Sequence, residues 1–201
     1  MYEIMLDLET LGTDPNSVIV TVGAIKFIRN KNIQEFKSVD KFYRRIDVKS
    51  CEQLGMTKDP ATMRWWKKQP QQVQHEAFNH PDRYKLKDVL QEFSYWIGSA
   101  DKVWANSPSF DCIILTQAYK KCGMRVPWEY WNTRDVRTIL DIGGVNLRTD
   151  IPQSGDEHNA VWDCYRQIQA IQLAEKRIGY FTKNHIMSTR LDSLKYNEYE
   201  T

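Results

Sequence analysis

Residues 2–9 read Tyr-Glu-Ile-Met-Leu-Asp-Leu-Glu, and this stretch decides the architecture of the chain. Its even-numbered residues are apolar, which is the pattern of a β-strand with one buried face. The alternation places Asp7 and Glu9 together on the other face, about 6–7 Å apart. Two carboxylates held this close repel each other unless a cation lies between them. Hard oxygen ligands of this kind indicate Mg²⁺ or Mn²⁺.

The chain has 201 residues, a length that suits one domain with a full hydrophobic core. We expect this domain to span residues 1–180, with residues 181–201 as a tail that packs on the domain or extends it. No apolar run approaches the roughly 18 residues of a membrane helix. The N-terminus also lacks a basic segment followed by an apolar one, so we expect a cytoplasmic protein without a membrane partner. The four cysteines form no Cys-x-x-Cys pair, which indicates reduced, buried thiols.

The order of the expected elements predicts an α/β fold. The first strand is followed by a turn and by two further strands, at 18–27 and 33–46, which form an antiparallel meander. Beyond the meander, a short helix that starts at Asp59-Pro60 precedes an amphipathic helix at 84–98 and a buried strand at 102–105. Further helices are expected at 109–122, 133–140 and 159–178. This order predicts a mixed sheet, antiparallel first and parallel afterwards, with helices on its faces.

A third carboxylate, Asp111, follows the buried strand in the segment Asn106-Ser-Pro-Ser-Phe110-Asp111. Ser107 or Ser109 can cap the next helix, with Asp111 in its first turn. An isolated aspartate at this position more often only complements the helix dipole. The carboxyl end of a central strand, however, is where open sheets bind their ligands. Asp111 is therefore a candidate functional residue.

A histidine and a fourth carboxylate lie near the end of the chain. His158 and Asp163 are five residues apart, which is about 140° around a helix. They therefore do not share a helix face. The spacing favours His158 in the loop before the last helix and Asp163 in its first turn or so.

These segments together resemble the exonuclease motifs of the DEDD superfamily. Asp7-x-Glu9, Asn106-x-x-x-Phe110-Asp111 and His158-x-Ala160-x-x-Asp163 have the order and spacing of its histidine-bearing DEDDh branch. The superfamily includes proofreading exonuclease subunits, ribonuclease T and oligoribonuclease. The resemblance spans residue 4 to about residue 175, which is most of the chain.

Two other stretches resemble the compact phage and bacterial enzymes of the branch, such as phage exonuclease A and the mycobacterial-type exoribonucleases. These stretches are Thr62-x-x-Trp65-Trp66-x-x-Gln69 and Arg134-Asp135-x-Arg137-Thr138. One departure is Thr10-Leu11-Gly12, where many relatives carry Thr-Thr-Gly or Thr-Gly after the first glutamate. The phage-like appearance would place the protein in the cytoplasm of a host cell.

The resemblance implies a ribonuclease H-like fold and 3′→5′ hydrolysis that releases nucleoside 5′-monophosphates. Two divalent cations, Mg²⁺ or Mn²⁺, would serve a two-metal mechanism. Asp7 would bridge the cations, Glu9 and Asp163 would complete the shell of the first, and Asp111 would serve the second. His158, whose ordinary pKa is near 6.5, is suited to take a proton from the attacking water. The catalytic residues are thus expected to be Asp7, Glu9, Asp111, His158 and Asp163.

The residues expected to contact substrate surround these carboxylates in the sequence. Leu11 would lie near the terminal base. Neighbouring residues on a helix point about 100° apart, so one of Trp65 and Trp66 can stack on a base while the other packs inward. The full expected set is Thr10, Leu11, Gly12, Trp65, Trp66, Asn106 and Phe110.

Residues 141–157 are polar and contain glycine, and they lead directly to His158. They fit two hypotheses equally well. One is a surface connection, and the other is a mobile flap that brings His158 in when substrate is bound.

The favoured function is a 3′→5′ exonuclease of single-stranded nucleic acid with a free 3′ end, with DNA slightly favoured over RNA. An exoribonuclease that trims RNA 3′ ends is the alternative, because no motif identifies contacts to a 2′-hydroxyl. A non-catalytic nucleic-acid-binding module is disfavoured by the complete acidic set. The oligomeric state is left open by the sequence.

Overall fold

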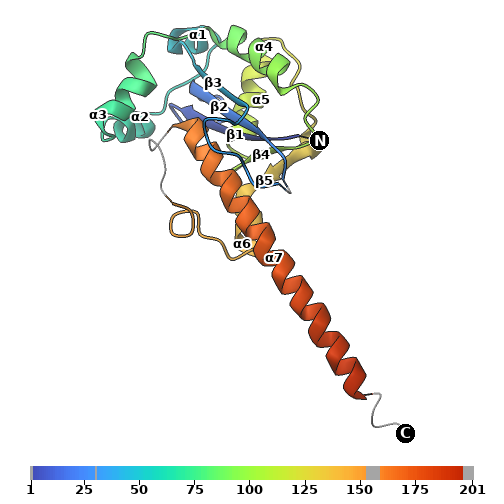
Figure 1. Cartoon of the computed structure of the whole chain (residues 1–201). Coiled ribbons are helices and arrows are strands. Elements are labelled where there is room, and N and C mark those ends of the chain that lie inside the picture. Colours follow the sequence, from blue (N-terminus) through green and yellow to red (C-terminus); the bar gives the residue numbers. More distant parts are fainter. Residues whose placement is uncertain (1, 30, 153–158, 197–201) are drawn as a thin grey trace.

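A five-stranded mixed sheet forms the centre of the molecule, as the computed structural model shows (Figure 1). The structure describes residues 2–29, 31–152 and 159–196, with side chains up to residue 179. The strand order is β3-β2-β1-β4-β5. β1 pairs antiparallel with β2, β2 antiparallel with β3, and β4 runs parallel to both β1 and β5. The strands are β1 (Glu3–Thr10), β2 (Ile19–Phe27), β3 (Lys41–Arg45), β4 (Val103–Ala105) and β5 (Thr133–Asp135).

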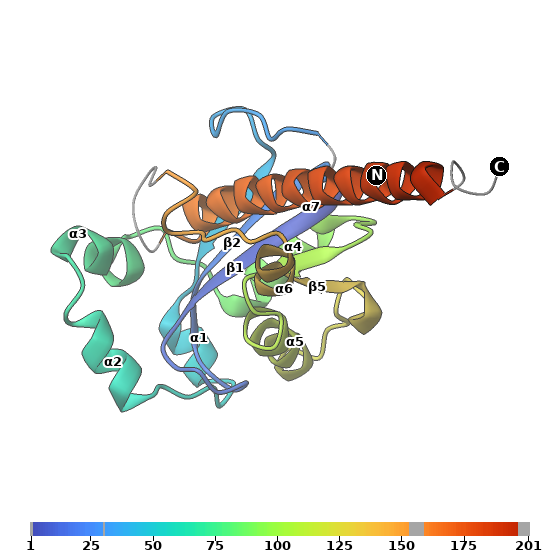
Figure 2. The same cartoon turned by 90° about the horizontal axis from the view of Figure 1, so that it is seen from below.

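Helices cover both faces of this sheet. Figure 2 shows α7 along one face, with α1 and α5 on the opposite side. The helices are α1 (Val48–Glu52), α2 (Pro60–Trp66), α3 (Gln71–Gln74), α4 (Leu86–Ile97), α5 (Asp111–Lys121), α6 (Val136–Ile142) and α7 (Ala160–Tyr196), with the short turns η1 (His75–Asn79) and η2 (Tyr130–Asn132). The described part of the chain contains no helix long and apolar enough to cross a membrane.

The alternation in β1 feeds two separate hydrophobic cores. Ile4, Leu6 and Leu8 pack with α4 and α5 in one core, and each is at most 5% exposed. Met5 points to the other face and packs with residues of α6 and α7. The mixed sheet between helices confirms the predicted fold class, and the antiparallel meander and later parallel strands lie in the predicted order.

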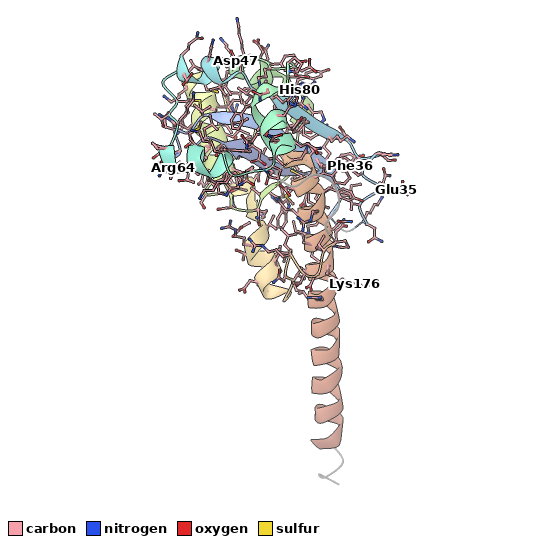
Figure 3. All side chains as sticks on the ribbon, turned by 90° about the vertical axis from the view of Figure 1, so that its left-hand side faces the viewer. Glu35, Phe36, Asp47, Arg64, His80 and Lys176 are labelled. Atoms are coloured by element: carbon pink, nitrogen blue, oxygen red, sulfur yellow. The ribbon has the colours of Figure 1, made fainter. Side chains whose placement is uncertain are left out.

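Two predicted elements need correction. The third strand is limited to Lys41–Arg45, because residues 33–40 leave the sheet as a loop. In that loop the Phe36 ring stacks on Trp162 of α7, and Figure 3 shows Phe36 beside this helix. The predicted helix at 133–140 is also two elements. Thr133–Asp135 pairs with β4 as an edge strand, and α6 begins after Asp135, whose side chain accepts a hydrogen bond from the Arg137 N–H.

The last helix is longer than the prediction of 159–178. α7 runs to Tyr196 without a break at residue 180, and its second half extends away from the body (Figure 1). At 1.5 Å per residue it is about 55 Å long. The segment from residue 181 expected to form a tail therefore starts as a continuation of this helix.

Candidate active site

Three of the predicted metal-binding carboxylates meet at one end of β1. Asp7, Glu9 and Asp163 each offer an oxygen, and these oxygens all lie within 4.8 Å of one another. Asp7 and Glu9 share the face of β1 that points toward α7, and Asp163 comes from the first turn of that helix. All three side chains are half-buried. The cluster therefore joins residues that are more than 150 positions apart in the sequence.

A glycine allows α7 to come this close to the sheet. Gly23 lies opposite Asp7 in the β1–β2 register. A Cβ atom placed on Gly23 would lie 2.6 Å from the Ala160 Cβ and 2.7 Å from the Ala160 carbonyl carbon. Contacts of this length are not tolerated, so the start of α7 packs directly on the backbone of β2. The Cys164 thiol also donates to the Gly23 carbonyl oxygen, at 3.6 Å.

Asp111 stands apart from the three clustered carboxylates but interacts with them electrostatically. It is 4% exposed, and its Oδ1 accepts a hydrogen bond of 3.1 Å from the Leu8 N–H. Burial raises its pKa to about 7, against hydrogen bonds and the nearby Arg137 guanidinium, which lower it. The expected serine cap is not formed, because the Ser107 and Ser109 hydroxyls bond to each other at 2.9 Å and α5 has no side-chain cap. Asp111 does lie in the first helical turn, as predicted.

The site brings carboxylates together at a place where water screens their charges only in part. Burial is the main cause that raises the pKa of Asp7 well above its ordinary value, and Asp111, Asp163 and Glu9 add to it. The pKa of Glu9 is raised for the same reasons, burial first and then Asp163 and Asp111. Divalent cations would remove this repulsion and satisfy the carboxylate oxygens. Oxygen ligands of this hard type suit Mg²⁺ or Mn²⁺.

A cleft of about 530 Å³ opens beside Glu9, between the end of β1 and α2. Five of the seven predicted substrate contacts line it. They are Thr10, Gly12, Trp65, Trp66 and Phe110. The cleft leads directly to the acidic cluster, since Glu9 belongs to both.

Trp65 and Trp66 differ in exposure, as the geometry of a helix predicts for neighbouring residues. Trp65 is 41% exposed, and Trp66 is 2% exposed. The Trp66 indole N–H donates to the Thr10 carbonyl oxygen at 2.9 Å, which ties α2 to the end of β1. Asp59 caps α2 by accepting from the Thr62 N–H at 2.7 Å, and Pro60 is its first residue, as predicted.

Two predicted substrate contacts are not part of the cleft, and one catalytic residue is not described. Leu11 is 1% exposed and belongs to the hydrophobic core, so its side chain has no free surface for a base. The predicted contact between Leu11 and the terminal base is therefore not formed, because the chain turns after Thr10 and packs Leu11 inward. Asn106 is half-buried and does not line the cleft. His158 lies outside the described residues, and its predicted role stays a prediction.

The structure adds one residue that the motifs did not indicate. Gln167 of α7 donates a hydrogen bond of 3.0 Å from Nε2 to Asp7 Oδ1. It follows Asp163 by four positions and therefore lies on the same helix face. The four-residue spacing from Asp163 could be read in the sequence, but the hydrogen bond to Asp7 on β1 could not.

The mixed sheet with an acidic cluster at the end of its first strand is the arrangement that the resemblance to the DEDD exonucleases implied. A model of the Rv2179c-like 3′-5′ exoribonuclease domain matches residues 2–174, so the chain belongs to this family. It is thus a 3′→5′ exonuclease that acts on nucleic acid.

Individual relatives agree with this family. The exodeoxyribonuclease of Enterobacteria phage T4 is 23% identical over an alignment of 206 positions, which covers 87% of this chain and 89% of the relative. The fold is similar to E. coli exonuclease I in its zinc-bound complex with single-stranded DNA, with a TM-score of 0.61 and 16% identity over 93% of this chain. The match covers 44% of exonuclease I, less than half of its length.

A shorter structural relative matches over most of its own length. The nuclease domain of 3′hExo, a DEDDh family member crystallised with rAMP, has a TM-score of 0.53 and 10% identity. The match covers 85% of this chain and 90% of that domain. At these identities the likeness shows the fold.

Proposed function

We propose that this protein removes nucleoside 5′-monophosphates from the 3′ end of single-stranded nucleic acid, DNA in preference to RNA, by a two-metal mechanism. The observation that carries this proposal is the cluster of Asp7, Glu9 and Asp163 oxygens within 4.8 Å at the end of an open cleft. Such a cluster offers the hard oxygen ligands that divalent cations prefer, and the cleft would take a nucleotide beside them.

Each carboxylate has a distinct place in the proposed mechanism. Asp7, Glu9 and Asp163 would hold one cation, and Asp7 would share a second with Asp111, directly or through water. Bound divalent cations supply an activated water and stabilise charge on the phosphate and the leaving 3′-oxygen. The protein's own task is to fix the four carboxylates, and the Leu8 N–H does this for Asp111.

His158 would take the proton from the attacking water. This role rests on the sequence motif and on the ordinary pKa of histidine, which suits a base at neutral pH. Residues 141–157 would act either as a surface connection or as the flap that brings His158 to the substrate. The structure describes them only up to residue 152.

The cleft suits an unpaired 3′ end. Trp65 is the exposed aromatic residue among those that line the cleft, and stacking on it requires an unpaired base. Opening a terminal base pair costs about 1–2 kcal/mol of stacking, or about tenfold per pair. Single strands and 3′ overhangs should therefore be degraded at least about tenfold faster than blunt duplex ends. Equal rates on a blunt duplex and its separated strand, at matched ends and salt, would remove the single-strand proposal.

The sugar preference has support on both sides. The phage T4 relative, matched over nearly its full length, is an exodeoxyribonuclease, which supports DNA. The family model carries the description of an exoribonuclease, which supports trimming of RNA 3′ ends as the second candidate.

One experiment tests activity, polarity and sugar preference together. Purified protein is incubated with 3′- and 5′-labelled DNA and RNA oligonucleotides of the same sequence, with Mg²⁺, Mn²⁺ or EDTA. We expect stepwise shortening of the 5′-labelled strand, immediate release of labelled mononucleotide from the 3′-labelled strand, and no reaction in EDTA. Faster hydrolysis of RNA than of DNA would select the exoribonuclease. If the protein binds the oligonucleotides but hydrolyses none of them in Mg²⁺ or Mn²⁺, the remaining interpretation is a non-catalytic nucleic-acid-binding module.

A further inference from the structure

A glutamine that belongs to none of the exonuclease motifs contacts Asp7 of the acidic cluster. Gln167 is 2% exposed, and its Nε2 donates to Asp7 Oδ1 at 3.0 Å. The opposite orientation of the amide would bring its oxygen against a carboxylate oxygen, so the donor orientation is fixed by Asp7. The Oδ1 atom of Asp7 is therefore held in place by a hydrogen bond from Gln167.

The second polar atom of the same side chain has no partner in the part of the chain that the structure describes. Gln167 Oε1 is buried and has no hydrogen-bond partner among the described residues. Burying an unpaired amide oxygen costs free energy that a methionine of similar length would avoid. Packing alone therefore does not explain a glutamine at this position. The hydrogen bond to Asp7 does.

Gln167 also couples the two elements that build the site. Asp163 and Gln167 are four residues apart on α7, so both face β1. Asp163 contributes an oxygen to the cluster, and Gln167 holds the aspartate that faces it. The orientation of the Asp7 carboxylate is thus set by the same helix that supplies a second ligand.

We infer that Gln167 is a positioning residue that orients the Asp7 carboxylate for divalent-cation binding. Resting on the proposed two-metal function, this inference adds a residue outside the carboxylate set. Gln167 is buried and bonds to Asp7, so it acts through Asp7 and not through contact with the nucleotide.

The test compares two glutamines on α7. Gln167→Met removes the donor and keeps the side-chain length. Gln172→Met is the matched control, because the hydrogen bonds of Gln172 among the described residues go to the loop after β2. There it accepts from the Ile33 N–H at 3.1 Å and donates to the Lys31 carbonyl. Mn²⁺ affinity is measured by calorimetry on the full chain, and kcat and KM are measured on a single-stranded DNA oligonucleotide across Mn²⁺ concentrations.

We expect Gln167→Met to weaken Mn²⁺ binding by about 10–100-fold, as is typical when a partner of a metal ligand is removed. Its kcat should fall at low Mn²⁺ and recover at high Mn²⁺, with KM for the oligonucleotide within about twofold of wild type. Its melting temperature in EDTA should not fall, since the unsatisfied Oε1 is removed as well. Gln172→Met should bind Mn²⁺ like wild type.

Three results separate the possible failures. Unchanged Mn²⁺ affinity in a folded Gln167→Met protein, or an equal loss in Gln172→Met, would overturn the positioning role alone. If Gln167→Met does not fold, Gln167→Asn decides, because its shorter amide does not reach Asp7 and should show the same loss of affinity. A wild-type protein that neither binds Mn²⁺ nor hydrolyses DNA or RNA would overturn the proposed function itself.

Discussion

The two faces of β1 differ in what they contribute to the molecule. Toward α4 and α5, the strand presents Ile4, Leu6 and Leu8, all buried in an apolar core. Toward α7, it presents the buried Met5 and then Asp7 and Glu9, whose pKa values are raised by burial and by neighbouring carboxylates. One face therefore supplies folding free energy, and the other holds like charges together at the expense of stability. The comparison indicates that the candidate active site is a region of like-charge repulsion, which the apolar core on the other face of β1 offsets.

The strongest test of this comparison is removal of one charge from the polar face. Asp7→Asn should abolish hydrolysis, because a neutral amide is a poor ligand for Mg²⁺ or Mn²⁺. The same change should leave the metal-free fold as stable or more stable, since it relieves repulsion with Glu9. Hydrolysis rates and melting temperatures in EDTA measure the two effects. Activity within about tenfold of wild type would remove the two-metal assignment.

The proposed base should have a smaller effect than a metal ligand. His158→Ala should lower turnover by about 10²–10⁴-fold, because general-base assistance is lost. The wild-type rate should rise with pH through the histidine range, and this rise should be absent in the variant. Rapid-quench kinetics on a single-stranded oligonucleotide measures both. If calorimetry shows that the variant no longer binds Mn²⁺, His158 is a ligand and its assignment as base is wrong.

A substitution at Gly23, which contacts the start of α7, tests how closely this helix packs on the sheet. Gly23→Ala should push the start of α7 away from β2 and cost about 1–3 kcal/mol of stability, as overpacking does. Activity should fall as well, because Asp163 moves with the helix. Gly179→Ala is the control, since a Cβ there meets nothing within 4 Å and should be neutral or slightly stabilising. Urea unfolding and hydrolysis assays compare the two. Wild-type stability and activity in Gly23→Ala would show that the contact yields easily.

The smallest effect concerns pH. The raised pKa values of Asp7, Glu9 and Asp111 mean that these groups bind protons more tightly in the folded protein than in the unfolded chain. Their protonated form therefore supports the metal-free fold at low pH. This support is lost as the pH rises from the ordinary carboxylate range toward the raised values, which for Asp111 is about 7.

In EDTA, the melting temperature should therefore be lower at pH 8 than at pH 5, and each 1 kcal/mol lost corresponds to about 2–4 °C. Mn²⁺ should restore stability at pH 8 by binding the ionised cluster. Asp7→Asn should show a flatter pH dependence. If the metal-free protein is more stable at pH 8 than at pH 5, repulsion among the ionised carboxylates does not destabilise the fold, and this interpretation of β1 is wrong.

The sequence alone was sufficient for the parts that depend on local pattern. The period of two in residues 2–9 fixed which side chains of β1 face the core and placed Asp7 and Glu9 together. Asp59 followed by Pro60 predicted the start of α2, and the 100° offset between helix neighbours predicted that Trp65 and Trp66 would differ in exposure. The spacing of the three motifs was enough to indicate the family.

Tertiary structure decided what depends on which elements meet. The sequence shows Gly23, Leu11 and Gln167, but not the helix start that presses on Gly23, the core that takes in Leu11, or the carboxylate that Gln167 holds. Residues 133–135 form a strand only because β4 offers a free parallel edge, and the loop at 33–40 leaves β3 to cover Trp162. These contacts join residues far apart in the chain, and local periodicity carries no information about such partners.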